Sequence, residues 1–518
     1  MAPKLALALL VVGAAAVTRP AGAADEIHWS IVGPNSVTFD WRGAETTIAY
    51  GLTPAYGQTT TAATPSPLPI SSPGPYWEAR LTGLLVNTLY HYSIGGGPDH
   101  TFRTPPPHGT PGFTVFVEGD VGDAATFPRM ATLQSMIAAA SPRFVLVVGD
   151  ITYANDFGQA QVDGHFNDVM VWSQDAAYMP AWGNHEWDQT TDDLRNYKGR
   201  FDFPNAQASP TAPDSAELVG GAPPYGEDWY WFDYGNTRFI AIPDPYTYGG
   251  GSPWADWNSR VGAIMDQAES DPAITFVVTF GHRPTYSSGN YAPGDLTLRA
   301  YLDALGAAHG KYVLDLAGHS HNYERSYRQS HVVHVTSGVG GANLEGTTDP
   351  TCLWKGGCPA PPWSAFRAMH HATVQLRFTA DAIEGQVLCG PDVNSPANPT
   401  DLTCTVGSLI DTFTIRPGVL SAPGPTPRPL GIDRVTPHPT AGGLDLSYSL
   451  AGWEPATLEL LDPAGRLILR RSLGAPGPGA HVLRLGREDF ARPGIYFARL
   501  RQSRGTAIAK LSVTAPGR

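Results

Sequence analysis

The stretch DLAGHSHNYERS (residues 315–326) places two histidines, His319 and His321, one residue apart at the end of an apolar run. Alternate side chains of a strand point the same way, so both imidazoles can face one spot. A buried strand has no structural need for such a pair at its mouth. The stretch therefore predicts a ligand site at a strand end, with the other ligands supplied by distant parts of the chain.

Four other apolar runs also end in polar residues that can bind metals. They contribute Asp120 in VEGD, Asp150 and Tyr153 in VVGDITY, Asn184 and His185 in WGNHE, and His282 in TFGH. From residue 113 onward such runs alternate with helix-like segments, which predicts an α/β domain with a central sheet covered on both faces. Ligands of open α/β sheets bind beyond the carboxyl ends of the strands, so we expect one shared pocket. A glycine precedes each strand-end group and is expected to let the chain turn sharply toward that pocket.

The combined donor set is two carboxylates, three imidazoles, an amide and a phenol, without a thiolate. Such a mixture of nitrogen and oxygen donors suits borderline divalent ions or ferric iron. Seven donors are too many for one tetrahedral ion, but they suffice for two ions that share a bridging carboxylate. Each residue alone is more simply a turn or core residue; the ordered set at five strand ends favours a metal centre.

The motifs GD-x-G, GD-x-x-Y, GNHE and GH-x-H, in this order, resemble the calcineurin-like metallophosphoesterase superfamily. Tyr153 and the NYERS segment resemble the purple acid phosphatases in particular. The resemblance implies an αββα-type sandwich over residues 111–417 and two bound metal ions. The first ion, ferric in that family, would take Asp120, Tyr153, His321 and the shared Asp150. The second, a divalent Zn, Mn or Fe, would take Asn184, His282, His319 and the same Asp150.

The resemblance also implies a reaction: hydrolysis of phosphate monoesters through in-line attack by a metal-bound hydroxide. His185 would donate to a phosphate oxygen, and Glu186 or Asp188 would either orient a ligand ring or be a plain solvated acid. Family members commonly carry a histidine nine positions after the His282 equivalent, where this chain has Tyr291. A phenol is a weaker acid than imidazolium. We therefore expect a preference for aryl phosphates or phosphoanhydrides, or protonation of the leaving group by Tyr291 or a water.

The rest of the chain divides into flanking segments. Residues 1–24 read as a secretory signal peptide with a short apolar core, and residues 25–106 resemble the fibronectin-III-like N-domain of the same family. A Pro-rich linker (418–430) leads to residues 431–518, which resemble Ig-like C-terminal modules of bacterial secreted proteins. We expect an extracellular or cell-surface protein whose last domain contacts a cell surface or the export machinery.

The charge of the chain limits its expected binding partners, and its cysteine content predicts its disulfides. The formal net charge is -13 without a basic cluster, which argues against nucleic acid, and no apolar run is long enough for a membrane span. Four cysteines in an exported chain predict two disulfides. Local pairs, Cys352 with Cys358 and Cys389 with Cys404, are favoured among three connectivities. A zinc knuckle is disfavoured because no CxxC pair occurs.

Two other functions fit the same sequence. A phosphodiesterase or nucleotide-hydrolysing enzyme would keep the metals and differ in its loops. A non-catalytic surface adhesive protein would explain the two flanking β-rich segments, but it would leave the complete set of candidate ligands without a use.

Overall fold

The structure of the protein is a computed structural model. This structure describes residues 24–187, 193–210, 212, 225–246, 254–349, 351–392, 395, 398–417, 430–437, 444–450, 455–474, 479–490, 492–502 and 505–513. The predicted signal peptide and linker lie outside the described residues, apart from residues 24 and 430.

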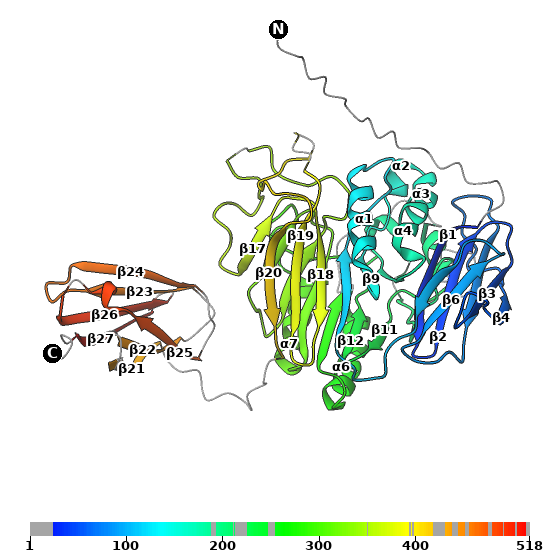
Figure 1. The fold of residues 1–518 in the computed structure, drawn as a ribbon. Coiled ribbons are helices and arrows are strands. Elements are labelled where there is room, and N and C mark those ends of the chain that lie inside the picture. Colours follow the sequence, from blue (N-terminus) through cyan, green and yellow to red (C-terminus); the bar gives the residue numbers. More distant parts are fainter. Residues whose placement is uncertain are drawn as a thin grey trace, which may run out of the picture.

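The N-terminal segment forms two small antiparallel sheets (Figure 1). One contains β1 (Asp25–Gly33), β2 (Ser36–Arg42) and β5 (Tyr76–Leu81). The other has the order β4 (Gln58–Thr61), β3 (Thr47–Gly51), β6 (Leu89–Ile94), β7 (His100–Arg103). Rings of Phe39 from the first sheet and Tyr92 from the second meet with centroids 4.5 Å apart. A shared aromatic core therefore joins the two sheets.

The central region contains two larger mixed sheets. The six-stranded sheet has the order β10 (Ala177–Ala181), β9 (Phe144–Val148), β8 (Phe113–Glu118), β18 (Ala372–Phe378), β19 (Ile383–Cys389), β20 (Leu409–Ile415). The seven-stranded sheet has the order β11 (Trp231–Tyr234), β12 (Thr237–Ala241), β13 (Phe276–Phe280), β14 (Tyr312–Ala317), β16 (Val333–Ser337), β15 (Tyr323–Ser326), β17 (Ser364–Ala368). Strands β8, β9 and β10 run parallel, as do β12, β13, β14 and β16.

The two large sheets pack on each other through aromatic rings. Phe113 contacts Tyr234 at 4.8 Å, and Phe378 contacts Phe239 at 5.4 Å. The alternation of strands and helices alone predicts a central sheet, whereas the structure divides these strands between two packed sheets. Strand β18, from far along the chain, pairs with β8 on one side of the first parallel group, and the later parallel strands form the second sheet.

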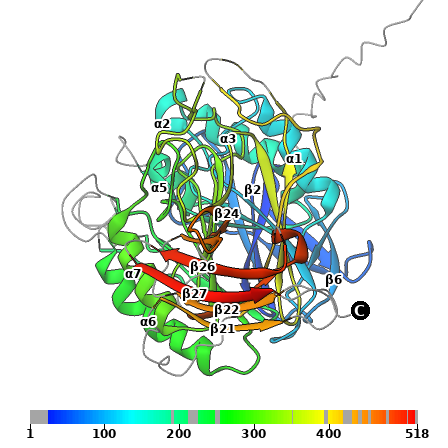
Figure 2. The ribbon, with the colours of Figure 1, turned by 90° about the vertical axis from the view of Figure 1, so that its left-hand side faces the viewer.

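Helices surround these sheets (Figure 1, Figure 2). They are α1 (Arg129–Ala140), α2 (Ala154–Phe157), α3 (Ala160–Asp168), α4 (Met170–Ser173), the 3-10 turn η1 (Asn184–Glu186), α5 (Asp193–Lys198), α6 (Ala255–Ser270) and α7 (Leu296–Ala308). All residues of β9, β10, β13 and β14 are buried, which accounts for their continuous apolar sequences. Among the described helices, none has the length and apolar character needed to cross a bilayer.

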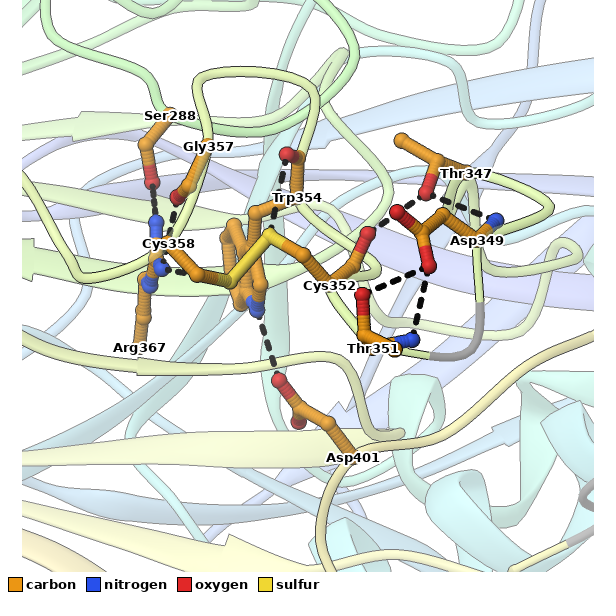
Figure 3. Close-up of a disulfide and its surroundings, with 10 residues drawn as sticks. All are labelled: Ser288, Thr347, Asp349, Thr351, Cys352, Trp354, Gly357, Cys358, Arg367 and Asp401. Carbon is orange, nitrogen blue, oxygen red and sulfur yellow. Dashed lines mark hydrogen bonds between the residues drawn. A yellow bond between two sulfur atoms is a disulfide. The ribbon is translucent and has the colours of Figure 1, made fainter.

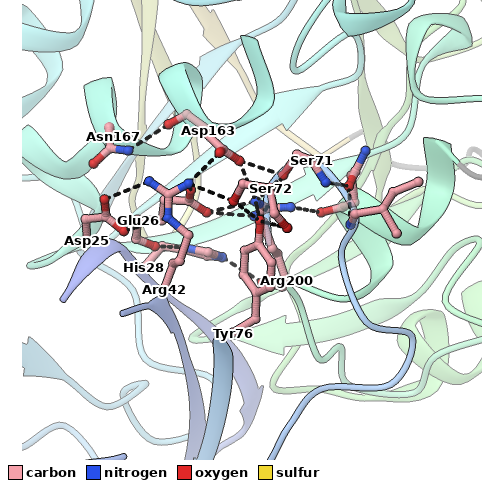
Figure 4. A network of polar contacts seen from close by, with 12 residues as sticks. Asp25, Glu26, His28, Arg42, Ser71, Ser72, Tyr76, Asp163, Asn167 and Arg200 are labelled. Atoms are coloured by element: carbon pink, nitrogen blue, oxygen red, sulfur yellow. Dashed lines mark hydrogen bonds and ion pairs between the residues drawn. The ribbon is translucent and has the colours of Figure 1, made fainter. Parts of the chain in front are cut away.

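A buried polar network joins the N-terminal sheets to the central region (Figure 4). The Arg200 guanidinium donates to Glu26 at 2.9 Å and to Asp163 at 3.1 Å, and Arg42 lies 3.0 Å from the second Glu26 oxygen. Around this network a continuous hydrophobic cluster extends from Ile27 to Ile415. The two segments thus share one core.

The C-terminal segment has a core of its own, built from residues such as Leu446, Leu458 and Leu500. One sheet contains β21 (Gly431–Pro437), β22 (Leu444–Leu450) and β25 (Gly479–Leu485); the other has the order β24 (Leu467–Gly474), β23 (Ala456–Leu461), β26 (Gly494–Gln502), β27 (Gly505–Val513), with η2 (Arg487–Asp489) beside them.

Both cysteine pairs are local, as predicted: Cys352 bonds Cys358 and Cys389 bonds Cys404. Figure 3 shows the first, whose loop is fixed by Trp354 donating to Asp401 at 2.6 Å. All four sulfurs are therefore used in disulfides, which leaves no thiolates for a zinc knuckle.

Candidate metal centre

Five strand ends deliver the candidate ligands. Strands β8, β9 and β10 belong to the six-stranded sheet, and β13 and β14 to the seven-stranded sheet. Each is followed, directly or after one residue, by a glycine and then by a polar residue: Asp120, Asp150, Asn184, His282 and His319. Because the two sheets pack face to face, side chains from both sheets reach one cluster.

Three of these residues hold the backbone in the left-handed region, with φ of 59° at Asp120, 48° at Asp150 and 65° at His319. Residues with side chains seldom adopt this conformation, and such strain concentrates at functional sites.

The preceding glycines mostly serve a different purpose from the predicted turn. Of the five, Gly149 alone has a positive φ, 82°. The others provide space: a Cβ at Gly183 would lie 2.2 Å from Asp150 Oδ1, and one at Gly318 would lie 2.5 Å from Asp120 Oδ2. Close approach of two chain segments, rather than a sharp turn, explains most of the glycines in these motifs.

A first group of donors contains Asp120, Tyr153 and His321. His321 Nε2 lies 3.1 Å from Asp120 Oδ1, and the Tyr153 hydroxyl lies 3.1 Å from the same nitrogen. His321 Nδ1 donates to the Asn343 carbonyl oxygen at 2.6 Å. That hydrogen bond fixes the tautomer of His321, so the lone pair of Nε2 faces the group and could bind a metal ion.

A second group contains Asn184, His282 and His319. His282 Nε2 lies 3.2 Å from Asn184 Oδ1 and 3.1 Å from His319 Nδ1. His282 Nδ1 donates to the Val148 carbonyl oxygen at 3.0 Å, so its Nε2 also faces the cluster.

Asp150 lies in both groups. Its carboxylate oxygens come within 4.8 Å of donor atoms on Asp120 and His321, and likewise of donor atoms on His282 and His319. Its Oδ2 is 3.1 Å from His282 Nε2. One carboxylate is thus placed between two sets of donors.

The electrostatics of the cluster require positive charge. Burial alone would raise the pKa of Asp150, but the imidazoles of His282 and His185 hold it below its usual range. Burial lowers the pKa of His282, yet the Asp150 carboxylate outweighs burial and raises it to about 9. At His321, Asp120 likewise outweighs burial and raises the pKa to about 10. Protons or metal cations can compensate these buried carboxylates, and the mixed nitrogen and oxygen donors fit borderline or ferric cations.

A pocket of about 380 Å³ opens onto the cluster. His185 lines it; its backbone N–H donates to Asp150 Oδ1 at 2.9 Å, and its ring packs 4.4 Å from that of Tyr153. Tyr291 also lines it, with its ring stacked on His319 at 3.7 Å. The structure therefore brings the seven candidate ligands together, with His185 and Tyr291 beside them. A larger hollow of about 840 Å³ beside the Cys352–Cys358 loop contains none of them.

Several residues of the site carry no sequence signal of their own. Asn343 and Val148 act through backbone carbonyls, which any residue supplies. Phe157 and Glu345 line the pocket from α2 and from the loop after β16. Sequence reasoning missed both because neither follows one of the five apolar runs.

Glu186 has a role that was not expected. It does not contact a candidate ligand ring but accepts backbone N–H bonds from Gly183 at 2.6 Å and from Asp150 at 2.9 Å. Glu186 thereby ties the ends of β9 and β10 together. Asp188, the other residue considered, lies outside the described residues.

The region that contains the candidate metal centre matches a known protein family. The model of the calcineurin-like phosphoesterase family matches residues 113–323. Curated relatives include a phosphoenolpyruvate phosphatase of Allium cepa, 27% identical over 339 residues that cover 57% of this chain and 63% of that protein. The Fe(3+)-Zn(2+) purple acid phosphatase 12 of Arabidopsis thaliana is 27% identical over 336 residues, covering 57% and 64%. The chain thus spans less than two thirds of the length of these relatives.

Solved structures share the fold. A purple acid phosphatase from yellow lupin (Lupinus luteus) seeds superposes with a TM-score of 0.57 at 19% identity, covering 78% of each chain. PhoD superposes with a TM-score of 0.54 at 12% identity, covering 76% of this chain and 90% of that one. The chain therefore contains a calcineurin-like phosphoesterase domain, and purple acid phosphatases are among its relatives.

Proposed function

We propose that this chain is a secreted acid phosphatase that hydrolyses phosphate monoesters at a pair of metal ions. The position of Asp150 between two donor groups carries the proposal. A ferric ion would be held by Asp120, Tyr153, His321 and Asp150, and a divalent Zn, Mn or Fe ion by Asn184, His282, His319 and Asp150. Relatives named as phosphatases, one of them an Fe(3+)-Zn(2+) enzyme, support this assignment.

When bound, the ions would acidify a water molecule and neutralise charge on the phosphate oxygens. The chain itself would orient the substrate. His185 borders the pocket, and its Nδ1 lies 2.7 Å from Asn155 Oδ1, which holds the ring beside the cluster for donation to a phosphate oxygen. Tyr291 is fixed against His319, and burial together with the charge of Glu345 raises the pKa of its phenol. The phenol is therefore a weak proton donor to a leaving group.

The flanking segments complete the proposal. We infer a fibronectin-III-like domain over residues 25–106, an αββα-type catalytic sandwich over 111–417 and an Ig-like domain over 431–518 that contacts a cell surface or the export machinery. The pairs of packed antiparallel sheets support the outer two assignments. The two disulfides support an oxidising, extracellular location.

The direct test is metal analysis of the purified protein together with hydrolysis of p-nitrophenyl phosphate and bis-p-nitrophenyl phosphate. We expect two metal ions per chain, faster turnover of the monoester, and loss of activity on chelation that metal restores. Faster turnover of the diester would favour a phosphodiesterase. A metal-loaded protein inactive on both would contradict catalysis and favour an adhesive role.

A further inference from the structure

We infer that the pocket selects monophosphate esters whose leaving group is a flat aromatic group without negative charge, and that it discriminates against polyphosphates and carboxylated esters. This inference rests on the proposed phosphatase function and deepens it. Two properties of the pocket wall carry it: aromatic rings at its border, and a surplus of acidic side chains.

The aromatic border consists of Phe157 and Tyr291. Although large and apolar, these side chains are 57% and 40% exposed, and both line the pocket. Phe157 packs edge-on against Phe127, with centroids 5.6 Å apart, and Tyr291 stacks on His319. Exposed rings held in fixed positions at a pocket form a surface on which another ring can stack.

The acidic side chains are Asp156 and Glu345, which line the pocket in addition to the candidate ligands. Asp156 lies 3.6 Å from His185. Glu345 has a buried carboxylate oxygen, Oε2, without a hydrogen-bond partner among the described residues. The Glu345 backbone N–H donates to the His321 carbonyl oxygen at 3.3 Å, which holds this residue at the pocket.

No lysine or arginine side chain belongs to the described lining of the pocket. Two guanidinium groups contact residues of the lining and are already paired: Arg283 donates to Asp244 at 2.9 Å and its Nη1 lies 3.3 Å from His319 Nε2, and Arg129 donates to the side-chain oxygen of Asn343. The segments between 113 and 417 that the structure does not describe contain neither lysine nor arginine in their sequences.

The charge of the proposed site favours substrates with one phosphate group over substrates with several. A ferric and a divalent ion would carry five positive charges, of which Asp120, Asp150, the Tyr153 phenolate and a hydroxide would offset four, so no positive charge would remain for an anion beyond one phosphate. Any further anionic group on the substrate would face the carboxylates of Glu345 and Asp156, while Arg283 and Arg129 are already paired with Asp244 and Asn343. An uncharged ring can instead stack on Phe157 and Tyr291.

The charge component is tested with phenyl phosphate and 4-carboxyphenyl phosphate, which differ by one remote carboxylate. We expect kcat/KM to be about tenfold lower for the carboxylated ester, as for like charges several ångströms apart at a protein surface. Glu345→Gln should narrow this ratio, whereas Glu384→Gln, on the distant strand β19, should leave it unchanged. Binding of the two corresponding phosphonates, measured by calorimetry, should follow the same order.

The stacking component is tested with phenethyl phosphate and hexyl phosphate, whose alkoxide leaving groups are similarly basic. The wild-type protein should favour the aromatic ester, and Phe157→Ala should abolish that preference. Leu296→Ala, which truncates an equally exposed apolar residue outside the pocket, is the matched control.

Equal kcat/KM and equal affinity for the charged and uncharged members, or efficient hydrolysis of pyrophosphate, would overturn the inference while leaving the phosphatase function intact. Failure to hydrolyse any monoester would overturn the proposed function, and the inference with it.

Discussion

Tyr153 is the side chain that would most directly report which metal ion the proposed site binds. Its hydroxyl lies 3.1 Å from His321 Nε2 and 3.4 Å from Asp120 Oδ1, and its ring is buried against Phe127. A tyrosinate bound to ferric iron should give a visible charge-transfer band and a purple or pink colour.

Tyr153→Phe should remove the band and leave the fold intact, because the ring contacts remain and about 1 kcal/mol of hydrogen bonding is lost. Visible absorption, iron content and thermal unfolding of both proteins check this. A colourless, fully active wild-type protein that contains only zinc or manganese would contradict the iron assignment and leave the phosphatase proposal standing.

At the same scale, the sequence identifies those residues whose type is unusual for their position. His319 and His321 stand out because imidazoles are rare at the end of an apolar run. The carbonyls of Val148 and Asn343 fix the ring tautomers of His282 and His321 but could come from any residue. Such backbone contacts depend on how the chain folds, so the sequence could not reveal them.

At the scale of elements, the strand ends were predictable because each apolar run stops at a glycine and a polar residue. The apolar pattern alone does not reveal the division of the strands between two sheets, which only the family resemblance implied, because that division involves pairing between β8 and β18, more than 250 positions apart. The role of the glycines was equally hidden: a Cβ at Gly183 conflicts with Asp150, which belongs to another strand end.

Gly183→Ala should therefore displace the Asp150 carboxylate and lower metal content and activity by at least about tenfold, an effect of more than about 1.4 kcal/mol. Gly262→Ala is the matched control, because Gly262 lies within α6 and a Cβ there meets nothing within 4 Å. That control should raise stability by about 0.5–1 kcal/mol. Elemental analysis and thermal unfolding measure both effects, and normal metal content in Gly183→Ala would refute the steric argument.

At the scale of the whole molecule, the joint between the N-terminal sheets and the catalytic region is rich in buried acids. Both carboxylate oxygens of Asp40 lack a hydrogen-bond partner among the described residues. Burial, followed by the charges of Glu78, Asp202 and Glu227, raises its pKa well above the usual value, and Arg200 only partly opposes this. Burial and neighbouring carboxylates also raise the pKa of Glu78 to about 7 and that of Glu227 to about 8.

These raised pKa values predict a protein that is more stable in acid. Between the unfolded and folded pKa values of such groups the folded state binds more protons, so stability falls as pH rises from about 5 to about 8. Relative to the wild type, Asp40→Asn should gain stability as pH rises from 5 to 8, because the carboxyl must take up a proton or be buried as an anion on folding and the amide need not. The Tm difference between the two proteins should be larger at pH 8 than at pH 5 by at least about 2 °C. The wild type and Asp40→Asn have the same proposed metal site, so the difference between their Tm values reports the titration of Asp40 and not that of the site. Asp381→Asn, with a side chain 74% exposed, is the control and should show the same Tm difference at both pH values. A Tm difference for Asp40→Asn that does not change with pH would show that Asp40 does not titrate between folded and unfolded states.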